Sequence, residues 1–247
     1  MIDGARPAVV LDRVSKSFGA KRVLHDVTLR IHRGESLCIL GRSGTGKSVM
    51  LKLLIALLKP DAGHIWIEQD EITGLTSSGL SRVRRKMGFL FQDAALFDSL
   101  SLYDNLALPL LRLTDKSPAD VETAVDRVLR QVGLGGDRQK MPSQLSGGMR
   151  KRAGLARALV LEPTILLADE PSSGLDRITA SEIDDLLLQQ KAEHHTTLIV
   201  VTHDVRGVRR IADRVVVLDQ GHVIADGTVA DVDHSDNHVA RHLISES

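Results

Sequence analysis

The sequence predicts an α/β fold with a mainly parallel core sheet, and three observations support this prediction. Ser36–Gly41, with the sequence SLCILG, is a short continuous apolar segment, as in strands that are buried on both faces. Two similar segments follow at Thr164–Glu170 and Thr196–Asp204, and a helical segment at Arg177–Lys191 separates them. Of the 247 residues, 43% are hydrophobic, which is ample material for a buried core. Because buried strands that alternate with helices form parallel sheets, we expect an α/β core.

The first part of the chain is expected to contain further strands and one helix. Ala8–Phe18 and Val23–Ile31 have β-type sequences, and in the second of them apolar and polar residues alternate, as in a half-buried strand. Lys47–Leu58 is predicted to be a helix that Pro60 stops. His64–Ile72 is predicted to be another strand or one arm of a hairpin.

The middle of the chain is predicted to be helical. Ser117–Pro118 places a capping serine before a proline at the first helical position; apolar residues then follow at helical spacing, and Gly133 closes the helix. A second helix is expected to run through Met149–Leu161, directly after a pair of glycines. Beyond it, Arg214–Gly227 is predicted to be a hairpin.

The helical middle interrupts the α/β pattern. We therefore predict an inserted helical subdomain at residues 94–160. The two parts of the α/β core are expected at residues 1–93 and 161–247. The sequence contains no internal repeat and no low-complexity tract that would suggest another division.

Composition and charge argue against a protein that binds nucleic acid. The chain has 32 basic and 32 acidic residues, so its formal net charge is zero, and only 2% of its residues are aromatic. Neither a basic surface for phosphates nor a set of rings for stacking on single strands is indicated. The basic runs Arg82–Lys86 and Arg150–Arg152 are better interpreted as solvated faces.

The single cysteine and the hydropathy pattern bear on the compartment. Cys38 has no second cysteine with which to form an intramolecular disulfide, and this fits a reducing compartment. The start of the chain lacks the basic and apolar regions of a secretory signal, so we expect none. The longest apolar-looking segment, Val49–Leu58, contains Lys52, so we expect no membrane span. Any role at a membrane would need a separate membrane partner.

The most specific motif is a phosphate-binding loop at Gly41–Ser48, with the sequence GRSGTGKS. It fits the pattern G-x-x-x-x-G-K-S, and a predicted strand before it and a helix after it supply the required context. The alternative, a glycine turn followed by a chance lysine, fits that context poorly. Lys47 is expected to contact the β- and γ-phosphates and Ser48 to ligate Mg²⁺. The nucleotide-binding residues predicted here are Gly41, Ser43, Gly44, Gly46, Lys47 and Ser48.

Two carboxylates follow the apolar segment Ile165–Ala168. At the carboxyl end of a buried strand, Asp169 is suited to hold Mg²⁺ and Glu170 to polarise the water that attacks the γ-phosphate. Alone, such a pair more often starts a solvated loop, but beside a phosphate loop the catalytic interpretation is stronger. His203 and Gln92 also stand at predicted strand ends, where such residues taken alone are more often structural or exposed.

Val10–Thr228 resembles the ATP-binding cassette (ABC) family through six motifs in the family's order. They are the phosphate loop, Gln92 as the Q-loop, Leu145-Ser146-Gly147-Gly148 as the signature, Asp169-Glu170, Ser173-Gly174-Leu175-Asp176 as the D-loop, and His203 as the switch histidine. The resemblance implies a P-loop NTPase fold of the ABC type, with an N-terminal antiparallel β subdomain and an inserted helical subdomain. It also implies an ATPase that uses Mg²⁺. The implied catalytic residues are Glu170, His203 and Gln92, and the implied metal ligands are Ser48, Gln92 and Asp169.

The resemblance explains why a second glycine-rich stretch lacks a lysine. Ser146, Gly147 and Gly148 precede a predicted helix, and helix N-termini bind phosphate. In the family, two cassettes pair head to tail, and each signature caps ATP in the other subunit's phosphate loop. The resemblance therefore implies a homodimer in which these three residues bind the γ-phosphate in trans. Asp176 is also expected to contact nucleotide, and Phe18 matches the aromatic residue that stacks on adenine, although core packing is its alternative.

Within the family, the stretches FQDAALFDSLSLYDNLALPL, LSGGMRKRAGLARAL and DEPSSGLDRITASEID look like the Mla-type cassettes that energise bacterial phospholipid transport between membranes. Many amino-acid importers instead have glutamine where this chain has Met149. The resemblance implies a peripheral subunit at the cytoplasmic face of the inner membrane, with two copies of this chain and two integral-membrane permease chains. It also implies a small accessory regulator and a lipid-carrier protein. An apolar run at Ala94–Leu100 is expected to receive the permease, to pack the subdomain interface, or both. The chain ends soon after HVARHLISES, without the longer C-terminal extension that some relatives have, so contact between subunits through the C-terminus is left open.

Two alternatives remain open at this point. The first is an importer ATPase for amino acids or another small solute, which would work with a periplasmic solute-binding protein. The second is a soluble, non-transport cassette in DNA repair or on the ribosome. Such proteins commonly have tandem cassettes or long coiled-coil insertions, and this sequence has neither. The sequence does not reveal the transported molecule, the direction of transport or the identity of the permease.

Overall fold

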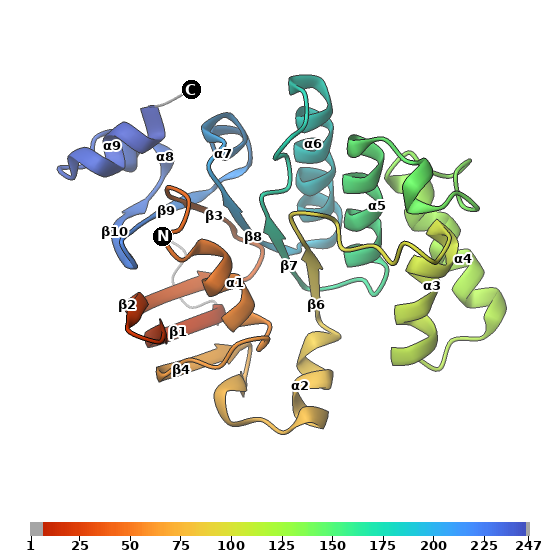
Figure 1. Cartoon of the computed structure of the whole chain (residues 1–247), viewed down its shortest axis with the longest axis horizontal. Coiled ribbons are helices and arrows are strands. Elements are labelled where there is room, and N and C mark those ends of the chain that lie inside the picture. Colours follow the sequence, from red (N-terminus) through yellow and green to blue (C-terminus); the bar gives the residue numbers. More distant parts are fainter. Residues whose placement is uncertain (1–6, 246–247) are drawn as a thin grey trace.

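The structure is a computed structural model, and it describes residues 7–245 (Figure 1). The strands are β1 (Pro7–Phe18), β2 (Lys21–His32), β3 (Ser36–Leu40), β4 (Ala62–Ile67), β5 (Asp70–Glu71), β6 (Met87–Leu90), β7 (Ile165–Asp169), β8 (Thr197–Thr202), β9 (Arg214–Asp219) and β10 (His222–Gly227). The α-helices are α1 (Lys47–Leu54), α2 (Ser77–Arg84), α3 (Leu102–Leu113), α4 (Pro118–Gln131), α5 (Gly147–Leu159), α6 (Arg177–His194), α7 (Val205–Ile211), α8 (Val229–Asp233) and α9 (His238–Ser245). Short 3₁₀ turns lie at Ile72–Gly74 and Pro142–Gln144.

The strands form two sheets, as the sequence predicts. The larger sheet has the order β10-β9-β3-β8-β7-β6, in which β9 to β6 are parallel and β10 is antiparallel to β9. Every residue of β3, β7 and β8 is buried, which is why their central residues are continuously apolar. The smaller sheet, β2-β1-β4-β5, is antiparallel throughout. The predicted fold class is therefore confirmed.

Two apolar clusters use opposite faces of the larger sheet. On β3, Leu37 and Ile39 belong to a cluster with α1 and the smaller sheet, whereas Cys38 and Leu40 belong to a cluster with α3 to α9. This division follows from the alternation of side chains along a strand. Because β3, β8 and β7 are parallel neighbours, their carboxyl ends lie side by side at one edge of the sheet, where loops lead to the helices that follow.

Some predicted boundaries are wrong by a few residues. The helix α1 ends at Leu54, four residues before the predicted end, and Pro60 does not stop it. Ala56 has a left-handed φ of 54°, and the N–H groups of Leu57 and Leu58 donate to the carbonyl of Lys52, so a turn closes the helix earlier.

The helix predicted after Ser117 is confirmed, with its cap. The Ser117 side chain accepts from the N–H of Asp120, and Asp120 reaches back to the N–H of Ser117, which forms a capping box. The predicted strand or hairpin arm at His64–Ile72 is the hairpin of β4 and β5.

The helices α3, α4 and α5 stand together at one side of the molecule (Figure 1). Their buried apolar side chains belong to the same cluster as one face of the larger sheet. The division of the chain at residues 94 and 160 stays a prediction.

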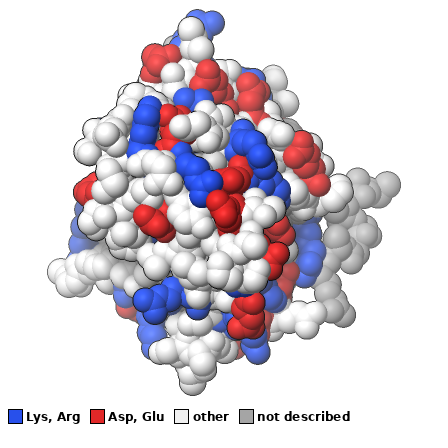
Figure 2. Space-filling model, turned by 90° about the vertical axis from the view of Figure 1, so that its right-hand side faces the viewer, with Lys and Arg blue, Asp and Glu red and all other residues white. Residues whose placement is uncertain are grey.

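Figure 2 shows the side of the molecule on which α3, α4 and α5 stand, where basic and acidic side chains are interspersed with uncharged surface. Within residues 7–245, no helix has the length and apolar content needed to cross a membrane.

Candidate active site

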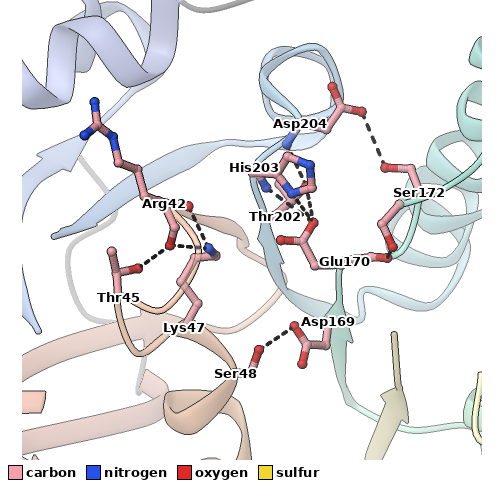
Figure 3. Close-up of polar contacts among 12 residues, drawn as sticks. Arg42, Thr45, Lys47, Ser48, Asp169, Glu170, Ser172, Thr202, His203 and Asp204 are labelled. Atoms are coloured by element: carbon pink, nitrogen blue, oxygen red, sulfur yellow. Dashed lines mark hydrogen bonds and ion pairs between the residues drawn. The ribbon is translucent and has the colours of Figure 1, made fainter. Parts of the chain in front are cut away.

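The predicted site residues lie where β3, β7 and β8 end. The loop Gly41–Gly46 leaves β3 and leads into α1, Asp169 is the last residue of β7, and His203 directly follows β8. Because β8 lies between β3 and β7 in the sheet, these three loops are neighbours (Figure 3). The carboxyl edge of a parallel sheet is where α/β proteins usually place their ligands.

The phosphate loop owes its shape to glycines. Gly44 and Gly46 have φ angles of 81° and 107°, which residues other than glycine rarely adopt. A Cβ atom at Gly46 would also lie 2.8 Å from Leu24 Cδ2 and 3.0 Å from the carbonyl oxygen of Val23. Gly46 is the N-cap of α1 and no side chain caps the helix, so the first N–H groups of α1 are available to an anion.

The side chain of Lys47 is buried under this loop. Its Nζ donates to the carbonyl oxygens of Gly41 at 2.6 Å and Arg42 at 3.0 Å (Figure 3). Burial lowers the pKa of Lys47, while the carboxylates of Glu170 and Asp169 act in the opposite direction. The lysine is therefore held inside the loop, where a phosphate group would meet it.

Ser48 and Asp169 come together as predicted. The Ser48 hydroxyl donates to Asp169 Oδ1 at 3.0 Å. Burial raises the pKa of Asp169, and this hydrogen bond opposes the rise. A hydroxyl and a carboxylate oxygen at this spacing are the kind of hard ligands that Mg²⁺ takes, so these residues fit the metal. Gln92, the third predicted ligand, does not join them; it lines a separate hollow with Gly147.

Glu170 and His203 also come together. Glu170 Oε2 lies 2.9 Å from His203 Nδ1, and it accepts from the Thr202 hydroxyl at 3.3 Å and the His203 backbone N–H at 3.4 Å (Figure 3). Asp169 and Glu170 are adjacent in sequence, yet they face different partners. The Asp169 carboxylate is therefore placed to bind a metal, and the Glu170 carboxylate is placed to accept a proton.

The signature residues form the start of α5. Ser146 is its N-cap and accepts from the N–H of Met149 at 3.2 Å, so the N–H groups of Gly147 and Gly148 have no acceptor within the helix. A Cβ at Gly148 would lie 2.5 Å from Thr179 Cγ2 of α6, so any side chain there would have to displace Thr179. The neighbouring Asp176 caps α6, and the hydrogen bond from the Thr179 hydroxyl lowers the pKa of Asp176.

The phosphate loop and the signature line two different hollows of the chain. Phe18, Gly44 and Lys47 line a cleft of about 360 Å³, which also includes Gly46 and Ser48. Gly147 lines a hollow of about 400 Å³ that contains none of the residues of that cleft. The Phe18 ring is 48% exposed, so the core-packing interpretation of this residue is wrong. Ser43, in the same loop as Gly44, is exposed.

Lys151 and Asp184 are buried ionisable residues that were not identified from the sequence. Lys151, predicted to lie on a solvated face, is buried among the residues behind the signature. The available signal was its spacing, because the buried Leu155 and Ala158 follow four and seven residues later on the same helix face. Asp184, in the middle of α6, is buried as well, and its pKa is raised to about 6 by burial and by the charge of Asp204.

The mainly parallel sheet, the glycine loop with its buried lysine and the paired acids beyond β7 define a P-loop nucleoside triphosphatase. Within that class, residues 24–173 match the family model described as ABC transporter, and the chain belongs to the ABC transporter family. It is an ATPase of this family, as the resemblance implies.

The chain is similar to transport ATPases with different named cargoes. It is 44% identical over 246 residues to the "Probable ribonucleotide transport ATP-binding protein mkl" of Mycobacterium leprae, an alignment that covers 98% of this chain and 71% of the relative. It is 40% identical over 209 residues to the "Methionine import ATP-binding protein MetN 1" of Pseudomonas fluorescens, covering 85% of this chain and 62% of the relative. The chain thus spans less than two thirds of the latter's length. Neither relative is named for phospholipid transport.

A solved structure shares the fold over nearly its whole length. It is the dimeric ATP-binding cassette MJ0796 in a post-hydrolysis state with ADP and Pi bound. The TM-score is 0.83 at 34% sequence identity, and the match covers 89% of this chain and 98% of that one. The two-sheet architecture described above is therefore that of an ABC-type nucleotide-binding domain.

Proposed function

We propose that this ATPase powers phospholipid transport between bacterial membranes, as a head-to-tail homodimer bound to a separate permease of the Mla type. The observation that carries the catalytic part is the divergence of the adjacent acids: Asp169 contacts Ser48, and Glu170 contacts His203. The three sequence stretches that resemble Mla-type cassettes support the lipid cargo.

The geometry suggests a role for each residue of the ATP site. The N–H groups of the phosphate loop and Lys47 bind the phosphates, and the exposed ring of Phe18 receives adenine. Ser48 and Asp169 would hold Mg²⁺, and the metal would supply positive charge to the phosphate oxygens. Glu170 orients and deprotonates the attacking water, and His203 holds the Glu170 carboxylate in place.

A second subunit would complete this site. Gly147, at the start of α5, lines a different hollow from that of the phosphate loop, so the N–H groups there would serve another nucleotide. In the head-to-tail dimer, Ser146, Gly147 and Gly148 contact the γ-phosphate held by the partner, and Asp176 lies beside them. The dimeric cassette MJ0796 supports the pairing of two such chains.

The membrane partner is proposed to dock at the apolar run Ala94–Leu100. Phe97 in this run is 47% exposed, as a docking surface requires. The chain would then work at the cytoplasmic face of the inner membrane, with a small accessory regulator and a lipid-carrier protein. The second candidate function is import of an amino acid or another small solute, which the likeness to a methionine import protein favours.

Replacing the proposed base tests the catalytic assignment. Glu170→Gln should retain ATP binding, lower hydrolysis by about 100-fold or more and accumulate a closed dimer in size-exclusion chromatography with ATP. Glu193→Gln, at an exposed position of α6, is the matched control and should behave like the wild type. Undiminished turnover in the Glu170 variant would contradict the assignment.

The cargo is tested by the partners. The chain is purified from native membranes in mild detergent, and the proteins and lipids that accompany it are identified by mass spectrometry. A permease with a lipid carrier and enriched phospholipid supports the proposal. A permease with a periplasmic solute-binding protein moves the function to solute import, and no membrane partner contradicts transport altogether.

A further inference from the structure

A buried lysine lies between the signature helix and the catalytic loop, and the mechanism above does not use it. Lys151, in the second turn of α5, is 7% exposed. Its Nζ donates to the carbonyl oxygen of Glu170 at 2.8 Å and to the Ser173 hydroxyl at 3.3 Å. None of the ion pairs found within residues 7–245 includes Lys151, so its partners are these two oxygens.

The carbonyl of Glu170 is the centre of a tight turn. It also accepts from the N–H of Ser173 at 3.2 Å and from the Ser173 hydroxyl at 3.0 Å. Glu170 has a φ of 49°, in the left-handed region that residues with a side chain seldom adopt. Such a backbone persists only where its surroundings hold it, and Lys151 is the donor to this carbonyl that lies outside the turn, on α5.

The neighbouring carboxylates favour a charged group at this place, and burial opposes it. Burial lowers the pKa of Lys151, but the carboxylates of Asp93, Glu170 and Asp169 all act to raise it. A cation here faces acidic groups from the Q-loop and from the end of β7. A neutral apolar side chain would leave the carbonyl of Glu170 with the Ser173 donors alone.

We propose that Lys151 is a positioning residue for Glu170: its ammonium fastens the Glu170–Ser173 turn to α5 and so holds the Glu170 carboxylate beside His203. The backbone carbonyl and the carboxylate belong to one residue, so a rotation of this turn also redirects the side chain. A displacement of about 1 Å in a reacting group costs as much as 100-fold in rate. This inference rests on the proposed role of Glu170.

The test compares steady-state ATP hydrolysis of the full chain in four variants. Lys151→Met should lower kcat by about 10- to 100-fold with little change in the KM for ATP, because Lys151 does not line the cleft of the phosphate loop. Ser173→Ala removes another donor to the same carbonyl, and the double variant should lose less activity than the two single losses multiplied. Lys140→Met, which removes an exposed lysine from the same helical region, is the control and should match the wild type.

Several results would overturn the proposal. They are an unchanged kcat in Lys151→Met, a raised KM at constant kcat, or strictly multiplicative losses in the double variant. If circular dichroism shows that Lys151→Met is unfolded, Lys151→Gln, which keeps a polar end, takes its place with the same expectations. A Glu170→Gln variant is measured beside them: if it turns over normally, the proposed function fails, whereas an inactive Glu170 variant beside an active Lys151 variant rejects only the present proposal.

Discussion

Asp184 is a buried acid with one unpartnered oxygen, and its replacement should stabilise the protein at alkaline pH. The residue is 5% exposed, and its Oδ1 has no hydrogen-bond partner in residues 7–245. It faces Asp204 across Gly207: a Cβ placed on Gly207 would lie 3.6 Å from both Asp184 oxygens and 3.3 Å from Asp204 Oδ2. Burial, followed by the charge of Asp204, raises the pKa of Asp184 from 3.8 to about 6, against the opposing charge of Arg210.

The size of the effect follows from this pKa. A rise of about two pKa units corresponds to roughly 3 kcal/mol at 1.36 kcal/mol per unit. Because the folded state binds the proton more tightly than the unfolded state, the favourable contribution of Asp184 is complete below pH 3.8 and is lost as the pH rises through about 6. Asn has the same shape and no charge, so Asp184→Asn should raise the free energy of unfolding at pH 8 by roughly 3 kcal/mol.

Urea denaturation followed by circular dichroism measures this gain. At pH 5, where the folded carboxyl is mostly protonated, the gain should fall to roughly half its value at pH 8. Asp98→Asn, at an exposed position, is the control and should show no such gain. A less stable Asp184→Asn protein at pH 8, or an equal gain at both pH values, would refute the reasoning.

Two further substitutions separate the two halves of the nucleotide site. Lys47→Ala removes the buried ammonium of the phosphate loop and should weaken ATP binding by at least about tenfold, measured by titration with a fluorescent nucleotide; unchanged affinity would contradict its phosphate role. Ser146→Arg should leave ATP binding by the monomer intact but abolish hydrolysis, since its side chain would occupy the place of the partner's phosphate. Full hydrolysis in this variant would argue against phosphate binding in trans. Because Ser146 caps α5, a melting curve is also measured to show whether loss of the cap, worth about 1 kcal/mol, has unfolded the variant.

The elements that the sequence predicted well are those in which local pattern and burial agree. The strands β3, β7 and β8 are buried on both faces, so their apolar runs are continuous and cannot be mistaken for solvated loops. The end of α1 was less predictable, because Ala56 takes a left-handed conformation that its residue type does not announce. There the contacts of the folded chain override local preference.

The candidate site shows the same division. The contacts of Ser48 with Asp169 and of Glu170 with His203 follow from motifs at the ends of neighbouring strands. The burial of Lys151 was not foreseen, because a basic triplet is usually solvated and the oxygens that hold this lysine lie 19 and 22 residues away in the chain. When the partners of a charged residue lie far away in the chain, the sequence around that residue does not indicate that it is buried.

The alternation of side chains along β3 has a consequence for unfolding. Leu37 and Ile39 pack in one apolar cluster, and Cys38 and Leu40 pack in the other. The strand β3 therefore belongs to both clusters. If one cluster loses its packing, one face of β3 becomes exposed, and β3 also supports the other cluster. The α/β core should therefore melt as one cooperative unit, with Trp66 fluorescence from the smaller sheet and the circular dichroism of the helices changing in a single transition.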